Sequence, residues 1–180
     1  MAVAPVPPVV SAGEYLRTAF RPDREYVEGF LMERGMPTIA HSLLQAILIA
    51  YFRLYAKSFR FVALPEARMQ IVDRSRYRVP DIILCPAPLP PGKVVTSVPW
   101  AVIEIMSPDD RMPDELDRFR DYKQIGVQNV ILLDPEGSTA FRFEEGSLLR
   151  TQFTSLELPT GSLPFDTEAI FQQLREELGQ

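Results

Sequence analysis

The sequence predicts one domain of mixed α/β (α+β) structure, and three observations lead to this fold class. Residues 41–57 repeat apolar side chains with helical spacing. Two runs of strand-forming residues follow at 59–72 and 77–85, and two short apolar runs at 100–106 and 127–133 are typical of buried strands. With 180 residues, of which 46% are hydrophobic and 24% charged, the chain is long enough to bury one core.

The first segment, residues 1–10, is apolar and rich in proline but contains no lysine or arginine. It therefore lacks the basic start and the helical run of a signal peptide, and we expect a flexible tail. Residues 11–180 form the predicted single domain, because no repeat and no change in composition marks a second one.

A short helix is predicted after this tail, because Ser11 and Glu14 have the spacing of a capping box. It is expected to run to about Phe20. Residues 24–33 then alternate polar and apolar side chains around Gly29, which indicates a strand that bends or forms a hairpin at the glycine.

The segment 41–57 predicts an amphipathic helix packed on a core. Its apolar residues are three or four positions apart, namely Leu44, Ile47, Leu48, Tyr51, Leu54 and Tyr55. The apolar stretch within it is interrupted by Gln45 and Arg53 and falls short of a membrane span, so we expect a soluble protein.

The runs 59–72 and 77–85 are predicted to be paired strands joined by a polar turn at 73–76. A proline-rich loop follows at 87–92. Beyond it lies the apolar run 100–106, which a single glutamate interrupts.

The C-terminal part predicts a helix at 114–125 closed by Gly126, because glycine favours the left-handed conformation after a helix. A buried strand at 127–133 and a paired strand at 140–143 follow it. The last predicted element is a helix at 167–178.

Cysteine content and charge limit the compartment and the partners. Cys85 is the only cysteine, so no intrachain disulfide can form and a reducing, cytoplasmic location is expected. A net charge of −5 argues against a general nucleic-acid binder. Arginines that are close in sequence predict either a local basic surface or a solvated hairpin rim; they are Arg60, Arg68, Arg74, Arg76 and Arg78.

Two carboxylates stand inside apolar strands, Asp81 and Glu104. Burying an ionised carboxylate is costly unless it is paired or bound to a metal ion. One such acid would suggest an ion pair with an arginine, but two on adjacent strands favour a shared site. Two carboxylates that hold Mg²⁺ through oxygen ligands suit the hydrolysis of phosphodiester bonds.

Several short motifs, in order and at characteristic spacing, together resemble one known family. They are Pro80-Asp81, Glu104 to Pro108, a helix ending at Tyr122 before Gly126-Val127, Leu133 to Pro135, and upstream Arg24 to Gly29 and the helix opening at His41. The chain resembles, over residues 14–171, the Uma-type restriction endonuclease family of the PD-(D/E)XK nuclease superfamily.

This resemblance implies a restriction-endonuclease-like fold, with a mixed central β-sheet flanked by helices. It implies that Asp81, Glu104 and the backbone carbonyl of Ile105 bind Mg²⁺, for which Mn²⁺ can substitute. Glu25 matches an acidic position near the site and either binds a second ion or its water, or pairs with Arg24. Family members resemble dimers, so a homodimer is expected, through the loop near Leu89 or the C-terminal helix.

The chain departs from the superfamily at the third catalytic position. Met106 stands where the superfamily has a lysine, which in the Uma-type branch lies on the following helix, four residues before the tyrosine. Arg118 occupies that position, one helical turn from Tyr122. Arginine keeps the charge and can clamp a phosphate, but it does not readily deprotonate. Lys123 lies on another face of this helix and is expected to be solvated.

Other polar residues carry open alternatives. The family resemblance favours a functional role for His41, whereas a histidine in the first turn of a packed helix is usually hydrogen-bonded locally. Cys85 is expected to be a small buried hydrophobe. Glu66 matches a family position or is a partner for Arg68 or Arg78. The acids of the 114–125 helix are expected to form an exposed face paired with its basic residues; they are Asp114, Glu115, Asp117 and Asp121.

Three functions follow. The first is a Mg²⁺-dependent endonuclease acting on DNA, with Asp81 and Glu104 on the metal and Arg118 on the scissile phosphate. The second is a nuclease-fold binding or assembly module without catalysis, favoured by the acidic charge and by Met106 and Arg118. The third is a hydrolase of a small phosphorylated substrate, which needs few basic contacts.

Overall fold

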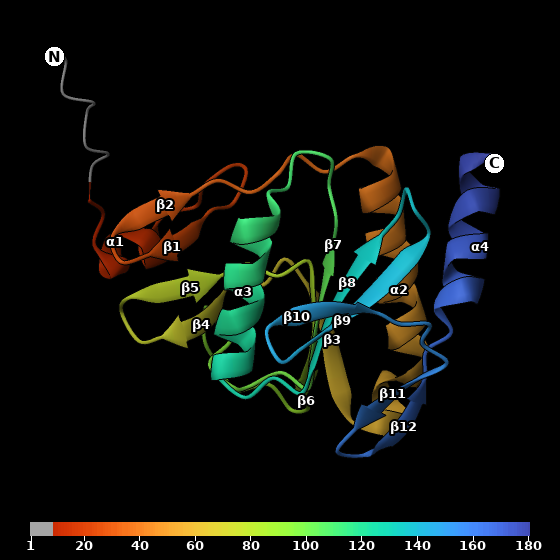
Figure 1. Cartoon of the computed structure of the whole chain (residues 1–180). Coiled ribbons are helices and arrows are strands. Elements are labelled where there is room, and N and C mark those ends of the chain that lie inside the picture. The colour runs from red at the N-terminus through yellow and green to blue at the C-terminus, as the bar shows by residue number, and fades with distance from the viewer. Residues whose placement is uncertain (1–8) are drawn as a thin grey trace, which may run out of the picture.

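The structure is a computed structural model of the chain, and it describes residues 9–180 (Figure 1). Most of the predicted tail therefore lies outside the described residues. At its end, the Val10 N–H donates a hydrogen bond of 2.8 Å to the Gly29 carbonyl, and the Val10 carbonyl accepts one from the Tyr26 hydroxyl.

The described residues form four helices and twelve strands. The helices are α1 (Ala12–Arg17), α2 (Ile39–Phe59), α3 (Met112–Gln124) and α4 (Thr167–Leu178). The strands are β1 (Glu25–Val27), β2 (Phe30–Met32), β3 (Phe61–Pro65), β4 (Met69–Val72), β5 (Arg76–Arg78), β6 (Ile82–Pro86), β7 (Ala101–Ile105), β8 (Asn129–Asp134), β9 (Thr139–Glu144), β10 (Ser147–Arg150), β11 (Ser155–Leu158) and β12 (Gly161–Pro164). All the predicted helices are present, although α1 ends at Arg17, three residues short of Phe20.

The central sheet has the strand order β10-β9-β8-β7-β6-β3. The neighbours β7 and β8 are parallel, and the other pairs are antiparallel. A parallel pair needs a crossover connection, and α3 supplies it between β7 and β8. The expected mixed central sheet flanked by helices is therefore confirmed.

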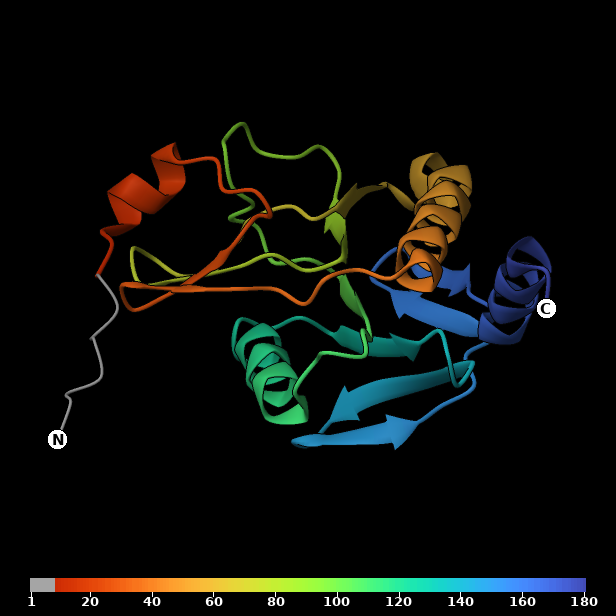
Figure 2. The same ribbon diagram turned by 90° about the horizontal axis from the view of Figure 1, so that it is seen from above.

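Helices cover both faces of this sheet, with α2 and α4 on one side and α3 on the other (Figures 1 and 2). Side chains alternate between the two layers along β7. Ala101, Ile103 and Ile105 pack in the core beneath α2 and α4, whereas Val102 packs with Phe119 of α3. The same alternation turns Glu104 toward α3.

A smaller sheet of order β2-β1-β5-β4 lies beside the central one with α1 packed on it (Figure 1). Its core is aromatic: the Tyr15 and Tyr26 rings stack with centroids 5.2 Å apart, and Tyr77 packs against both. Arg68 lies over the Tyr15 ring at 4.5 Å and forms an ion pair with Asp23.

The predicted runs 59–72 and 77–85 do pair with each other, but each is divided between two sheets, so only the expectation of two continuous strands was wrong. β3 pairs with β6 in the central sheet, whereas β4 pairs with β5 in the smaller one. Glu66 between β3 and β4 has a left-handed backbone with φ of 46°, and Pro80 between β5 and β6 has no N–H for a sheet. Both interruptions redirect the chain from one sheet to the other.

The predicted hairpin at Gly29 is confirmed. β1 and β2 pair across a two-residue turn in which Glu28 and Gly29 have φ of 50° and 97°. Positive φ at both turn residues suits the twist of a tight hairpin. The strands β10, β11 and β12 were not predicted.

One described helix, α2, is long and apolar enough to cross a membrane by length and composition alone. This exceeds the shorter apolar stretch expected from the sequence. Leu44, Leu48 and Phe52 of α2 are fully buried in the core that α2 shares with the central sheet. The helix therefore packs as the core helix that its spacing predicted.

Candidate active site

A cleft of about 260 Å³ opens where β7 ends and β6 begins. Its lining brings together residues that are far apart in sequence, among them Arg34, His41, Asp81, Glu104, Ile105 and Arg118. A larger cleft of about 550 Å³ lies beside it and shares Asp23 and Glu66, but neither buried carboxylate lines it. We therefore place the candidate chemistry in the smaller cleft.

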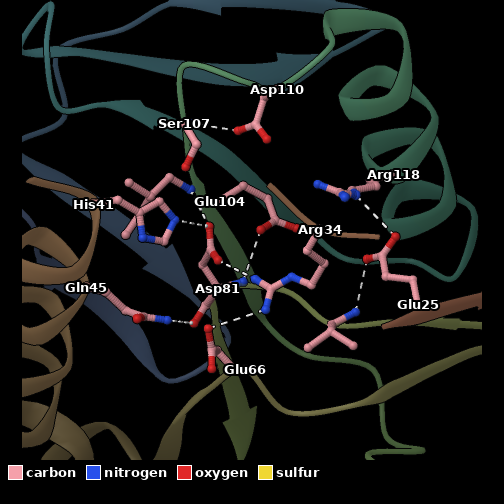
Figure 3. A network of polar contacts seen from close by, with 12 residues as sticks. Glu25, Arg34, His41, Gln45, Glu66, Asp81, Glu104, Ser107, Asp110 and Arg118 are labelled. Atoms are coloured by element: carbon pink, nitrogen blue, oxygen red, sulfur yellow. Dashed lines mark hydrogen bonds and ion pairs between the residues drawn. The ribbon is translucent and has the colours of Figure 1, made fainter. Parts of the chain in front are cut away.

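Asp81 and Glu104 are held together by reciprocal backbone hydrogen bonds across the two strands (Figure 3). The Asp81 N–H donates to Glu104 Oε2 at 3.0 Å, and the Ile105 N–H donates to Asp81 Oδ2 at 2.8 Å. Both acids are only 4% exposed. The prediction that these two acids share a site is thus matched by their positions.

Of the two buried acids, Glu104 is the one whose ionised form is disfavoured by its surroundings. Burial, and next the neighbouring Asp81 carboxylate, raise the pKa of Glu104 well above its usual range. The Tyr122 hydroxyl on α3 donates a hydrogen bond of 2.6 Å to Glu104 Oε1 and opposes this shift. Tyr122 thereby orients the carboxylate from the α3 side.

Tyr122→Phe is expected to lower the free energy of unfolding by about 1–3 kcal/mol, because a buried carboxyl oxygen loses its donor. The change removes only the hydroxyl and keeps the buried Tyr122 ring in the core between α3 and the central sheet. Urea denaturation checks the value. Tyr77→Phe is the matched control, since the Tyr77 hydroxyl accepts a hydrogen bond of 3.3 Å from Arg74 N–H far from the carboxylates. Equal losses in both variants would contradict a special role for the Tyr122 hydroxyl.

Asp81 is surrounded by donors from other elements. Arg34 Nη2 donates to Asp81 Oδ1 at 2.5 Å, and His41 Nε2 lies 3.2 Å from Asp81 Oδ2. Gln45 Nε2 donates to the Asp81 backbone carbonyl at 2.9 Å. Burial alone would raise the pKa of Asp81, but the hydrogen bond with His41 and the charge of Arg34 outweigh it and lower the pKa.

The position of His41 in the first turn of a helix predicts a local hydrogen bond for its ring. The ring contacts a distant residue instead. The His41 backbone N–H bonds to the helix cap Thr38 Oγ1, but the ring reaches Asp81, forty positions along the chain. His41 Nδ1 is buried and has no hydrogen-bond partner among the described residues. The ring is thus directed into the cleft.

Glu25 lies deeper, behind Arg118, and is 1% exposed. It accepts hydrogen bonds from Arg78 at 2.7 Å, from the Val79 N–H at 3.1 Å and from Arg118 at 3.2 Å. Burial would raise the pKa of Glu25, but Arg118 and Arg78 reverse this and lower it. The proposed pair with Arg24 was wrong, because Arg24 forms an ion pair with Glu33 instead.

Arg118 lines the cleft but is held by two acids. Its Nε donates to Glu25, and its Nη1 donates to Glu115 at 2.5 Å. Burial opposes the charge, but Glu25 and Glu115 raise the pKa of Arg118 above its ordinary value, so it stays protonated. Arg118 is thus a fixed cation at the cleft wall.

The expected exposed acidic face on α3 was only partly correct. Asp117 is exposed and pairs with Arg120, as predicted. Glu115 and Asp121 are instead buried, at 4% and 3% exposure. Burial raises the pKa of Glu115 to about 7, against the opposing charge of Arg118.

A chain of alternating charges runs from the cleft across the back of α3 to the smaller sheet. Its members, each paired with the next, are Glu115, Arg118, Glu25, Arg78, Asp121, Arg76 and Glu28. Unlike Arg74, which is 88% exposed on the β4–β5 turn, Arg76 and Arg78 are largely removed from solvent, with side chains 28% and 8% exposed. They bind buried acids that connect β1, β5 and α3.

The remaining predicted residues occupy other environments. Glu66 pairs with Arg34 at 3.3 Å, and not with Arg68 or Arg78 as proposed. Cys85 is fully buried, and burial raises its thiol pKa to about 12, in agreement with a small buried hydrophobe. Lys123 donates to the Gln128 carbonyl at 2.6 Å, so it is anchored at the end of α3 rather than freely solvated.

Sequence reasoning missed Arg34 and Gln45. Gln45 follows His41 by four residues and lies on the same helical face, a spacing that could have paired it with the histidine. Arg34 stands in an irregular segment without any motif, and we see no signal in the sequence for it.

The donors in the cleft fit a hard divalent cation. Within residues 9–180, no group of three or more histidine, cysteine, aspartate or glutamate side chains is arranged as a metal site. Asp81 and Glu104 supply carboxylate oxygens, however, and Mg²⁺ is commonly bound by one or two carboxylates with waters completing its shell. The raised pKa of Glu104 marks an excess of buried negative charge that a cation would relieve.

Comparison with known proteins places this geometry in context. The model of the family Uma2, described as "Putative restriction endonuclease", matches residues 13–170. A crystal structure of a putative nuclease belonging to DUF820 from Anabaena variabilis is similar, with a TM-score of 0.74 and 23% identity over 92% of this chain and 99% of that chain. The comparison with curated proteins found no match.

A cryoEM structure of a DrdV–DNA complex is also among the similar structures. It has a TM-score of 0.41 and 15% identity over 75% of this chain, and the match covers 12% of the DrdV chain. Of these two structures, the one from Anabaena variabilis bears on the fold.

Proposed function

This chain belongs to the Uma2 family, and from that premise we propose that it is a metal-dependent nuclease that hydrolyses phosphodiester bonds of DNA. The observation that carries the proposal is the pair Asp81 and Glu104, buried side by side at the floor of a cleft. Two adjacent buried carboxylates are costly without a cation, and catalytic use of a metal ion accounts for their presence.

Mg²⁺, or Mn²⁺ in its place, would be held by Asp81, Glu104 and the backbone carbonyl of Ile105. When bound, such an ion supplies Lewis-acid stabilisation of phosphate charge and lowers the pKa of a water molecule. The residues of this chain then have to present the two carboxylates in a fixed arrangement.

The hydrogen bonds in the cleft support this positioning role. The Ile105 N–H and His41 fix one oxygen of Asp81, and Tyr122 fixes one oxygen of Glu104. Arg118 adds a permanent positive charge at the cleft wall, where a guanidinium suits contact with a phosphate. Glu25 supports Arg118 from behind rather than facing the phosphate itself.

A second candidate is a nuclease-fold binding or assembly module without catalysis. Its support is the third catalytic position, where Met106 replaces lysine and Arg118 is already bound to Glu25 and Glu115. A cation held by two acids has less charge to offer a substrate. This candidate and the first make opposite predictions in one assay.

The deciding experiment incubates the whole protein with supercoiled plasmid in Mg²⁺, in Mn²⁺ and with a chelator. We expect nicked and linear plasmid with either metal and intact plasmid with the chelator. Parallel incubations with RNA and with nucleoside phosphates identify the substrate class. Phosphate release from nucleotides without plasmid cleavage would favour a small substrate, and no product from any of them would favour the inactive module.

A further inference from the structure

Arg34 places a guanidinium directly against the candidate metal-binding acid (Figure 3). It lies in the irregular segment between β2 and α2. Its Nη2 is 2.5 Å from Asp81 Oδ1 and its Nη1 is 3.3 Å from Glu66 Oε1. The side chain is 15% exposed, and the Asp81 side chain is 5% exposed, so solvent screens their interaction little.

Arg34 is the positive charge that balances Asp81. In the described part of the chain, no other arginine or lysine lies within ion-pair distance of Asp81; His41 is its remaining partner of that kind. Asp81, Glu104 and Glu66 all favour the charged guanidinium against the effect of burial, which is why the pKa of Arg34 is raised. In the absence of a metal ion, this arginine is what makes burial of Asp81 tolerable.

A guanidinium and a divalent cation on the same carboxylate repel each other. A lysine could relieve that repulsion by losing a proton, but an arginine side chain stays protonated in proteins. Arg34 therefore has to move away from Asp81 when a cation binds there. Glu66 is half exposed on the other side of the guanidinium and offers it an alternative partner.

The backbone around Arg34 is less free to move than its side chain. A Cβ atom on the next residue, Gly35, would lie 2.7 Å from Asp110 Oδ1 and 3.7 Å from the Ser107 Cβ. The segment is thus packed closely on the turn that follows β7. Rotation of the long arginine side chain is then the simplest way to clear Asp81.

We propose that Arg34 is a built-in counter-ion of Asp81 that a divalent cation must displace, and that it therefore weakens metal binding in the cleft. The inference rests on the proposed metal-dependent function. It assigns Arg34 a positioning role that sets the metal affinity, distinct from that of Arg118, which is bound to other acids.

The test measures Mn²⁺ binding to the whole protein by isothermal titration calorimetry. Arg34→Met, which removes the charge but keeps an unbranched side chain, is expected to bind Mn²⁺ at least tenfold more tightly than the wild type. Arg34→Gln is a second neutral variant in case the methionine variant does not fold, and it should show the same direction. Arg34→Lys keeps a positive charge that deprotonation can remove, and it is expected to bind Mn²⁺ more tightly than the wild type but less tightly than the neutral variants.

Arg74→Met is the matched control, because it also removes one positive charge but the Arg74 side chain is 88% exposed on the β4–β5 turn. It should bind Mn²⁺ like the wild type. A second readout is thermal unfolding without metal, in which Arg34→Met should melt at a lower temperature than the wild type. Adding Asp81→Asn to Arg34→Met should abolish the tight binding, which places the ion at this acid.

The possible outcomes separate the two proposals. Wild-type binding with equal or weaker binding by both neutral variants would overturn the role of Arg34 and leave the metal-dependent function intact. Binding by the neutral variants alone would support the inference in its strongest form. Absence of binding by folded wild type and folded variants would overturn both.

Discussion

Asp81→Asn is expected to lower the rate of plasmid cleavage by about a thousandfold or more. The substitution keeps the size of the side chain but removes the negative charge that a divalent cation requires, and the metal contributes several kcal/mol to such reactions. Each 1.36 kcal/mol corresponds to a factor of about ten in rate. Single-turnover cleavage of supercoiled plasmid at saturating Mg²⁺ measures the effect.

The control for this variant is Asp117→Asn, which also removes one acid from the chain. The Asp117 side chain is 66% exposed on α3 and pairs with Arg120 outside the cleft. We expect cleavage by this variant at the wild-type rate. Circular dichroism establishes that Asp81→Asn is folded. If folded Asp81→Asn cleaved plasmid like the wild type, the assignment of this cleft as the active site would be wrong.

Arg78→Met is expected to lower the free energy of unfolding by about 3–5 kcal/mol, because it leaves buried acids without their partner. Arg78 is 7% exposed and binds Glu25 at 2.7 Å and Asp121 at 2.6 Å. In this variant Glu25 still pairs with Arg118, and Asp121 still pairs with Arg76. The loss of stability is therefore not twice that of a single unpaired acid. Urea denaturation with linear extrapolation gives the value.

Arg120→Met provides the comparison for a surface ion pair. The side chains of Arg120 and Asp117 are 58% and 66% exposed, and exposed pairs typically contribute about 0–1 kcal/mol. A loss for Arg78→Met as small as that for Arg120→Met would mean that the buried acids are accommodated without their arginine. The chain of alternating charges would then be of little importance to stability.

Helices were predicted from sequence more reliably than the division of the strands between two sheets. The helix at α2 follows from apolar spacings of three and four, which are local. The pairing of β3 with β6, and of β4 with β5, depends on contacts between distant segments and on the left-handed backbone at Glu66. A propensity for strands cannot choose between such partners.

The acids of the candidate site were identifiable because an acid in an apolar strand is energetically anomalous. Asp81 and Glu104 stand out in this way, and the family resemblance supplied Tyr122 and His41 as candidates. The partners of these acids carry no such signal in the sequence. Arg34 reaches Asp81 from an irregular segment, and Asp121 of α3 pairs with Arg76 and Arg78 of the smaller sheet. Such choices are made by the tertiary structure, because any of many arginines could satisfy the same carboxylate.

The charge chain behind α3 also limits how the cleft can open. It connects α3 to β1 and β5 through successive buried ion pairs, so separating these elements would break several of them together. We expect α3 and the smaller sheet to move as one rigid body. Because the backbone at Gly35 is also packed closely on the turn after β7, widening of the cleft for a bulky substrate would then fall to rotation of side chains at its wall, such as Arg34.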